Sequence, residues 1–186
     1  MSVCIVRRHL PYVDALEARE PAAVDLVVIH CTELPDLTTA RQYGERIHHA
    51  DSGTGNSGHF YVERSGKIEE WVPVERVAHH VRGYNPRSVG IELVNCGRYP
   101  DWFDSRGQHM REPYPEAQIQ GLLTLLSHLR AALPELRWIA GHEALDTARV
   151  AASDRPELSV PRKMDPGPLF PWPRILAGCP LKLLQT

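Results

Sequence analysis

The sequence lacks several features that would place it in a special class of protein. Its four cysteines are far apart and form no CxxC pair, which argues against a disulfide scaffold or a four-cysteine zinc site and favours reduced thiols. It has no block of Lys or Arg, and its formal net charge is −2, so we expect neither nucleic acid nor a membrane as a partner. No apolar run approaches the roughly 20 residues that a membrane-spanning helix needs.

The first twenty residues also lack the pattern of a signal peptide, because Arg7, Arg8 and His9 interrupt the apolar residues early. The sequence therefore predicts a cytoplasmic protein, and leaves open export or delivery by a route that needs no signal. The remaining composition, 42% hydrophobic and 24% charged, is that of an ordinary globular protein with one core. We expect a single domain over residues 1–186, with its core at about 24–178, acting as a monomer.

Strand and helix patterns alternate along the chain, which predicts an α/β fold with a mixed central β-sheet flanked by helices. The predicted strands are 25–31, 59–64 and 67–72 (a hairpin around Ser65-Gly66), 88–95 and 137–142. The predicted helices run from a cap at Thr38 or Thr39 to about residue 50, from Pro115 to about residue 133, and over 172–177. We expect a long surface loop at 96–113 and a rigid turn at 162–168, and make no assignment for 143–160.

Two of the ten histidines, His30 and His142, each end a predicted strand and precede a loop. Sites in α/β proteins are commonly built at this end of the strands. Asp165 lies between Lys163 and a Pro-Gly-Pro turn that restricts the backbone. Two imidazoles and one carboxylate suit a catalytic Zn²⁺ that keeps one open position. Spacing alone also allows three unrelated structural residues, because the three are dispersed and form no HExxH motif.

Seven short blocks follow one another in the chain: VIHC at 28–31, GHFYVERSGK at 58–67, AHH at 78–80, GYN at 83–85, SVGIELV at 88–94, GH at 141–142 and RKMDPGP at 162–168. In this order they make the chain, from about Leu26 to Trp172, resemble the zinc-dependent N-acetylmuramoyl-L-alanine amidases. That family includes the AmpD-type amidases, phage T7-type lysozyme and the peptidoglycan recognition proteins. Asp165, where some relatives have a cysteine, matches the AmpD-type pattern.

The resemblance assigns a role to each matching position. It implies that His30, His142 and Asp165 are the zinc ligands, that Glu92 is the catalytic acid and base, and that Lys163 stabilises the oxyanion. It also places His80 and Asn85 beside the substrate. Without the resemblance, Glu92 would be a solvated carboxylate on a strand face or one partner of an ion pair, and Lys163 would be an exposed loop lysine. For His80, a structural hydrogen bond is the equal alternative to a substrate contact.

Three tryptophans, Trp71, Trp102 and Trp138, are candidates to stack on sugar rings. Trp102, in the loop 96–113, is the preferred one, because Trp138 lies in a core strand. The resemblance implies hydrolysis of the amide between N-acetylmuramic acid, or its anhydro form, and L-alanine in peptidoglycan or muropeptides. The alternative is a muropeptide-binding module of the same fold that has no activity. The sequence leaves open whether the substrate is a soluble anhydro-muropeptide or the intact wall. It also leaves open whether the role is recycling, phage lysis or delivery into a competitor.

Two features depart from the pattern of these relatives. Some of them carry a catalytic tyrosine where this chain has Gly58, so we expect Glu92 to do the proton transfer. The segment 143–164, between the second histidine and the aspartate, is longer than usual, and we expect it to change the rim of the cleft.

Overall fold

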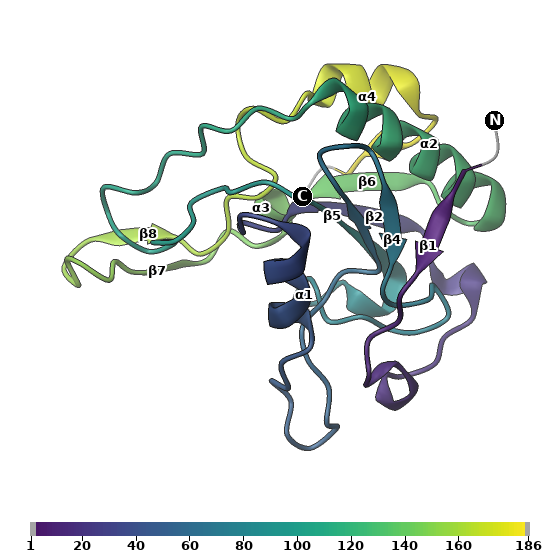
Figure 1. Ribbon diagram of the computed structural model, residues 1–186, viewed down its shortest axis with the longest axis horizontal. Coiled ribbons are helices and arrows are strands. Elements are labelled where there is room, and N and C mark those ends of the chain that lie inside the picture. Colours follow the sequence, from purple (N-terminus) through teal and green to yellow (C-terminus); the bar gives the residue numbers. More distant parts are fainter. Residues whose placement is uncertain (1–2, 185–186) are drawn as a thin grey trace.

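A mixed β-sheet organises the computed structural model, which describes residues 3–184 (Figure 1). Residues 1–2 and 185–186, at the two ends of the predicted domain, lie outside the described residues. In this part of the chain the main sheet has seven strands, in the order β1-β4-β3-β5-β2-β6-β9. The strands are β1 Ile5–Arg7, β2 Leu26–Cys31, β3 Phe60–Val62, β4 Ile68–Glu70, β5 Ser88–Leu93, β6 Trp138–Gly141 and β9 Lys182–Leu183. Neighbouring strands are parallel except β3 and β4, which form the predicted antiparallel hairpin. The predicted α/β fold with a mixed sheet is confirmed.

Strand β2 is an interior strand of the sheet, next to the central strand β5. Every residue from Leu26 to Cys31 is buried, as its continuous apolar sequence predicts. It pairs in parallel with β5 on one side and β6 on the other. The carboxyl ends of the three strands therefore meet, and the register places His30 directly opposite Glu92.

Helices α2 (Glu116–Ala132) and α4 (Trp172–Gly178) cover one face of the sheet (Figure 1). The predicted stripe of α2 packs into the main core, against the apolar residues of β2 and β5 that alternate onto this face. Its buried members are Ile119, Leu122, Leu126 and Leu129, followed by Leu133 beyond the helix, while Leu123 is only partly buried. Leu125 and Gln118 are also buried.

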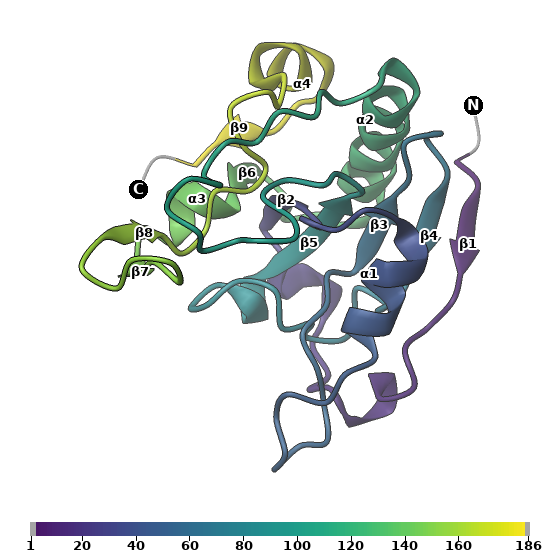
Figure 2. The same cartoon turned by 60° about the vertical axis from the view of Figure 1, so that its left-hand side comes forward.

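Helix α1 (Leu37–Gly44) lies on the opposite face (Figure 2). Its cap is Asp36, whose carboxylate accepts the Thr39 N–H at 2.7 Å, so the predicted Thr cap is wrong. An aspartate is at least as good a cap as threonine and stands earlier in the chain. The helix ends at Gly44, short of the predicted residue 50, because glycine weakens a helix. Trp71 packs beneath α1, fully buried and stacked on Tyr61, so it offers no surface to a sugar.

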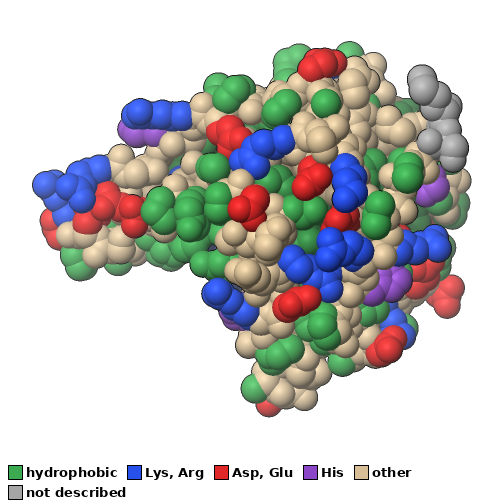
Figure 3. Space-filling model, viewed as in Figure 1, with side chains coloured by type: hydrophobic (Ala, Val, Ile, Leu, Met, Phe, Trp, Pro, Cys, Tyr) green, Lys and Arg blue, Asp and Glu red, His purple; other side chains and the backbone are tan. Residues whose placement is uncertain are grey.

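The segment 143–164 forms a projecting arm. Helix α3 (His142–Leu145) opens it, and β7 (Arg149–Ala151) and β8 (Ser159–Pro161) pair as an antiparallel hairpin at its end. The predicted loop 96–113 runs beside the hairpin (Figures 1 and 2), where Ser153 N donates to Phe103 O and Ser105 bonds Asp154. Figure 3 shows both charge signs spread over this face of the molecule. Among the described residues, no helix combines the length and the apolar character needed to cross a membrane.

Three 3₁₀ turns complete the described elements: Val13–Ala15, Pro21–Ala23 and Asn85–Arg87. The last of these leads into β5, and the segment before it, around Val81, packs on Leu26 and Val28 of β2. That packing places residues 78–85 over the same side of β2 as His30.

Candidate active site

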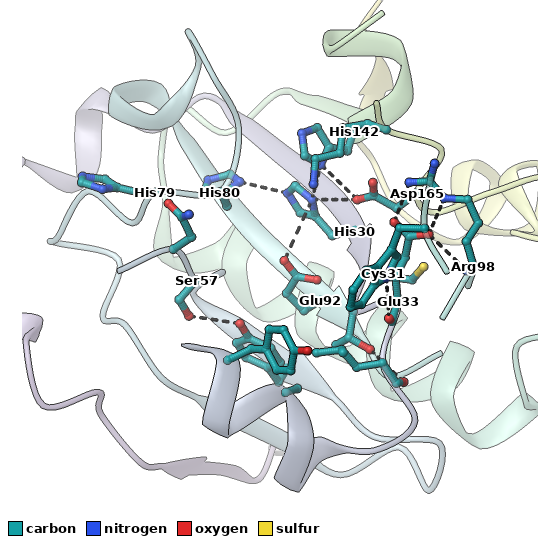
Figure 4. A pocket seen from close by; sticks show the side chains of 18 of the residues that line it. His30, Cys31, Glu33, Ser57, His79, His80, Glu92, Arg98, His142 and Asp165 are labelled. Carbon is teal, nitrogen blue, oxygen red and sulfur yellow. Dashed lines mark hydrogen bonds and ion pairs between the residues drawn. The ribbon is translucent and has the colours of Figure 1, made fainter. Parts of the chain in front are cut away.

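Three polar side chains converge at the carboxyl ends of β2 and β6. His30 is the fifth residue of β2, His142 directly follows β6, and Asp165 lies in the turn that leads to α4. His30 Nδ1 lies 2.9 Å from His142 Nδ1, and Asp165 Oδ2 lies 3.0 Å from each of these nitrogens (Figure 4). The structure thus brings together three residues that are 112 and 23 positions apart along the chain.

All three side chains are removed from water. His30 is 2% exposed, and His142 and Asp165 are 3% exposed. Burial lowers the pKa of His30 to about 4, with His142 adding to the effect and Asp165 opposing it. Burial alone would raise the pKa of Asp165, but His142 and His30 outweigh it and hold that pKa well below the usual range. The aspartate is therefore ionised beside a neutral His30.

This cluster fits a metal ion. Its donors are two imidazole nitrogens and a carboxylate oxygen, all within 4.8 Å of one another. The second carboxylate oxygen, Asp165 Oδ1, is buried and has no hydrogen-bond partner among residues 3–184. Such an oxygen is costly to bury unless a cation balances it. Two histidines and a carboxylate with an open side are also the donor set of catalytic divalent metal sites.

Glu92 extends from β5 toward the cluster (Figure 4), and its Oε1 lies 4.0 Å from His30 Nδ1. Burial raises its pKa to about 8, with a further contribution from Asp165 that Lys163 partly offsets. Gly58 provides the room for this side chain, because a Cβ at that position would lie 2.8 Å from Glu92 Cγ. A carboxyl with such a pKa beside a metal site can accept and return a proton near neutral pH.

Lys163 lines the same pocket, two residues before Asp165. Its positive charge lowers the pKa of His30, Glu92 and Asp165. Within the described part of the chain no carboxylate forms an ion pair with it, so the ammonium group is available to an anion in the pocket.

The three residues predicted to contact substrate also line the pockets at this edge. His80 lies next to His30, with 3.0 Å between His80 Nδ1 and His30 Nε2. Asn85 Oδ1 accepts the backbone N–H groups of His80 and Val81. Trp102 lies on the pocket wall, where its indole N–H donates to the Glu33 carbonyl at 3.0 Å.

The sequence of the chain is similar to those of a known protein family. The sequence profile described as N-acetylmuramoyl-L-alanine amidase matches residues 20–168. The chain belongs to the N-acetylmuramoyl-L-alanine amidase family. Among amidases of known sequence, AmiD of Escherichia coli is 35% identical over 121 residues, which are 60% of this chain and 38% of AmiD. The endolysin of Escherichia phage T7 is 27% identical over 134 residues, 72% of this chain and 84% of the endolysin.

Solved amidase structures share the fold. LysC from Clostridium intestinale superimposes with a TM-score of 0.68 at 21% identity, over 97% of this chain and all (100%) of LysC. AmiD in complex with anhydro-N-acetylmuramic acid-L-Ala-D-gamma-Glu-L-Lys superimposes with a TM-score of 0.63 at 25% identity, over 84% of this chain and 57% of AmiD. The chain thus spans only part of AmiD but nearly all of LysC.

Several residues of this amidase pocket were not predicted from the sequence. The pocket has a volume of about 360 Å³, and its unpredicted lining includes Tyr61, Ser57, His79 and the buried ion pair of Glu33 with Arg98. Strand alternation could have found Tyr61, which stands opposite Glu92 in the register of β3 and β5. No local sequence pattern predicts the Glu33–Arg98 pair, because its two residues are 65 positions apart.

Proposed function

We propose that this chain is a zinc-dependent hydrolase of the amide between N-acetylmuramic acid, or its anhydro form, and L-alanine of a stem peptide. The observation that carries the proposal is the convergence of His30, His142 and Asp165 beside Glu92. The family supports the reaction, and the AmiD relative was solved with an anhydro-muramyl peptide as its substrate.

In this proposal, His30, His142 and Asp165 hold Zn²⁺, which when bound polarises a carbonyl and lowers the pKa of a water molecule. Glu92 takes the proton of the attacking water and delivers it to the leaving nitrogen of L-alanine. Its raised pKa suits both steps, because the ionised carboxylate is then a stronger base toward the water proton and the protonated carboxyl can deliver that proton to the nitrogen near neutral pH. Lys163 donates to the oxyanion of the tetrahedral intermediate, a contact worth about 3–4 kcal/mol in other enzymes.

A muropeptide-binding module without activity is the alternative. A binding module has no need of an acid–base group or of a free ammonium beside its ligand site. This chain has Glu92 and Lys163 in those places, together with a complete donor set. These residues favour catalysis.

The test uses purified protein with a measured zinc content. We expect release of the stem peptide from an anhydro-muramyl peptide, and loss of both bound zinc and activity in His30→Ala and in Asp165→Ala. A protein that binds the muropeptide without cutting it, or a His30→Ala variant with full activity, would contradict the proposal.

The same assay separates the two classes of substrate. Rates on purified sacculi and on a soluble anhydro-muramyl peptide are compared at matched bond concentrations. We propose that the soluble fragment is the better substrate, because the related AmiD was solved with a soluble anhydro-muramyl peptide as its substrate. Faster cleavage of sacculi would instead assign the chain to wall lysis.

A further inference from the structure

The ring of His30 has a second nitrogen, which faces away from the candidate metal site. His30 Nε2 lies 3.0 Å from His80 Nδ1 (Figure 4). His80 Nε2 lies 3.2 Å from Ser88 Oγ, and the Ser88 hydroxyl donates to the Tyr84 carbonyl at 2.8 Å. These contacts form a continuous hydrogen-bond chain from a backbone carbonyl to a candidate ligand.

The last member of this chain fixes the direction of every hydrogen bond in it. A carbonyl oxygen can only accept, so the single hydroxyl proton of Ser88 points at Tyr84. Ser88 Oγ then accepts from His80, which puts the proton of His80 on Nε2. A neutral His80 has a lone pair on Nδ1, so the proton between the two rings belongs to His30 Nε2.

The consequence appears on the other side of His30. A neutral imidazole with its proton on Nε2 has a bare Nδ1, and this atom faces Asp165 Oδ2 at 3.0 Å and His142 Nδ1 at 2.9 Å. A proton on His30 Nδ1 would instead have made a good hydrogen bond to Asp165. The hydrogen bonds on the Nε2 side of His30 exclude that option and leave the Nδ1 lone pair of His30 facing Asp165 and His142.

We propose that His80 and Ser88 are positioning residues that hold His30 as the Nε2-protonated tautomer, so that its Nδ1 stays free to bind the metal. The inference rests on the proposed zinc site. His80 would thus orient the metal ligand His30, because both ring nitrogens of His80 already have partners within the protein.

The neighbouring backbone is built to hold the His80 ring in place. Asn85 Oδ1 accepts the N–H of His80 at 3.1 Å and of Val81 at 2.7 Å, which fixes the segment before β5. Gly90 in β5 lies directly against the ring. A Cβ at Gly90 would lie 2.6 Å from His80 Cγ and 2.7 Å from His80 Nδ1, so only a residue without a side chain allows this placement.

The first test reads the tautomers directly. Long-range ¹⁵N–¹H correlation NMR of the metal-free wild-type protein distinguishes Nδ1–H from Nε2–H for each histidine, and it needs neither zinc nor activity. We expect Nε2–H for both His30 and His80. A His30 protonated on Nδ1 would overturn the inference, whatever the protein hydrolyses.

The second test measures Zn²⁺ affinity by competition with a chelating dye. We expect His80→Ala and Ser88→Ala to weaken zinc binding about 10- to 100-fold, as the loss of a hydrogen-bond partner of a metal-binding histidine does in other metalloproteins. His80→Asn should recover most of the affinity, because its side-chain carbonyl can accept from His30 Nε2. Gly90→Ala should weaken binding by displacing the ring without removing any polar atom.

His79→Ala is the matched control, since His79 precedes His80 and lines the same pocket but packs against His49. Its zinc affinity should equal that of the wild type. A His80→Ala protein with wild-type affinity would refute the inference. His30→Ala separates the two failures. If His30→Ala loses zinc while His80→Ala does not, the role proposed for His80 and Ser88 is wrong but the metal site stands. If His30→Ala binds zinc normally, the metal site itself is wrong.

Discussion

At the scale of single residues, the account depends on Glu92 and Lys163 performing different tasks. Glu92 lies 4.0 Å from His30 and has a raised pKa, whereas Lys163 is a cation without an acidic partner in the described chain. Neither belongs to the donor triad. Removing either should therefore damage turnover without removing the metal.

The Glu92→Gln variant keeps the size of the side chain and loses its ability to transfer a proton. We expect kcat to fall about 10²- to 10⁴-fold, the usual contribution of a general acid–base. Zinc content, measured by elemental analysis, should stay at the wild-type level. Turnover close to that of the wild type would mean that another group moves the proton.

The Lys163→Met variant keeps most of the aliphatic stem and removes the charge. We expect kcat to fall about 10²- to 10³-fold, as when one donor to an oxyanion is lost. The measurement separates kcat from KM. A rise in KM at unchanged kcat would show that Lys163 binds the substrate rather than the transition state.

At the scale of elements, Arg98 connects parts of the rim that are distant in sequence. Its guanidinium pairs with Glu33 before α1 and donates to the Pro161 carbonyl at the end of β8. Both partners are buried, with side-chain exposures of 1% for Arg98 and 9% for Glu33. The pair therefore anchors the loop 96–113 and the projecting arm to the pocket.

Breaking this pair leaves a buried charge without compensation. We expect Arg98→Met to lower the free energy of unfolding by about 3–5 kcal/mol, measured by chemical denaturation. Arg106→Met is the control, because Arg106 lies in the same loop and pairs with Asp104 and Asp154 while 77% exposed. An exposed pair is screened by water and contributes much less to stability than a buried one. Equal losses in the two variants would contradict the anchoring role.

The elements also show how far sequence reasoning reaches. Strand β2 was predictable from its continuous apolar run, and strand β5 and helix α2 were predictable because their apolar residues repeat with the period of the element. The arm 143–164 was not, because each of its strands has only three residues, too few to show a repeating pattern, and β8 is held by a distant partner, Arg98. Helix α1 was placed too late, since its cap is Asp36.

For the site, the ordered blocks indicated which residues to bring together, and the register of β2 with β5 and β6 explains why they meet. The residues that support His80 could not be predicted from the sequence. Ser88 stands eight positions after His80, and only the folded loop before β5 brings its hydroxyl to the ring. Gly90 is part of one block, but its contact with His80 depends on the tertiary packing.

At the scale of the whole molecule, the metal should contribute to the stability of the fold. The donor atoms of His30, His142 and Asp165 face one another in a buried place, which is unfavourable without a cation. At free zinc 100 times its Kd, binding adds about 2.7 kcal/mol, which raises the Tm of a domain of this size by roughly 5–10 °C. Scanning calorimetry with zinc and with a chelator measures the difference. Asp165→Ala should show no such difference, and an unchanged wild-type Tm would argue against a bound metal.

The most direct test of the central claim is an anomalous difference map from zinc-loaded crystals, recorded on both sides of the zinc absorption edge. The account predicts one strong peak, within bonding distance of His30 Nδ1, His142 Nδ1 and an oxygen of Asp165. A peak elsewhere in the molecule, or none at full zinc loading, would contradict it.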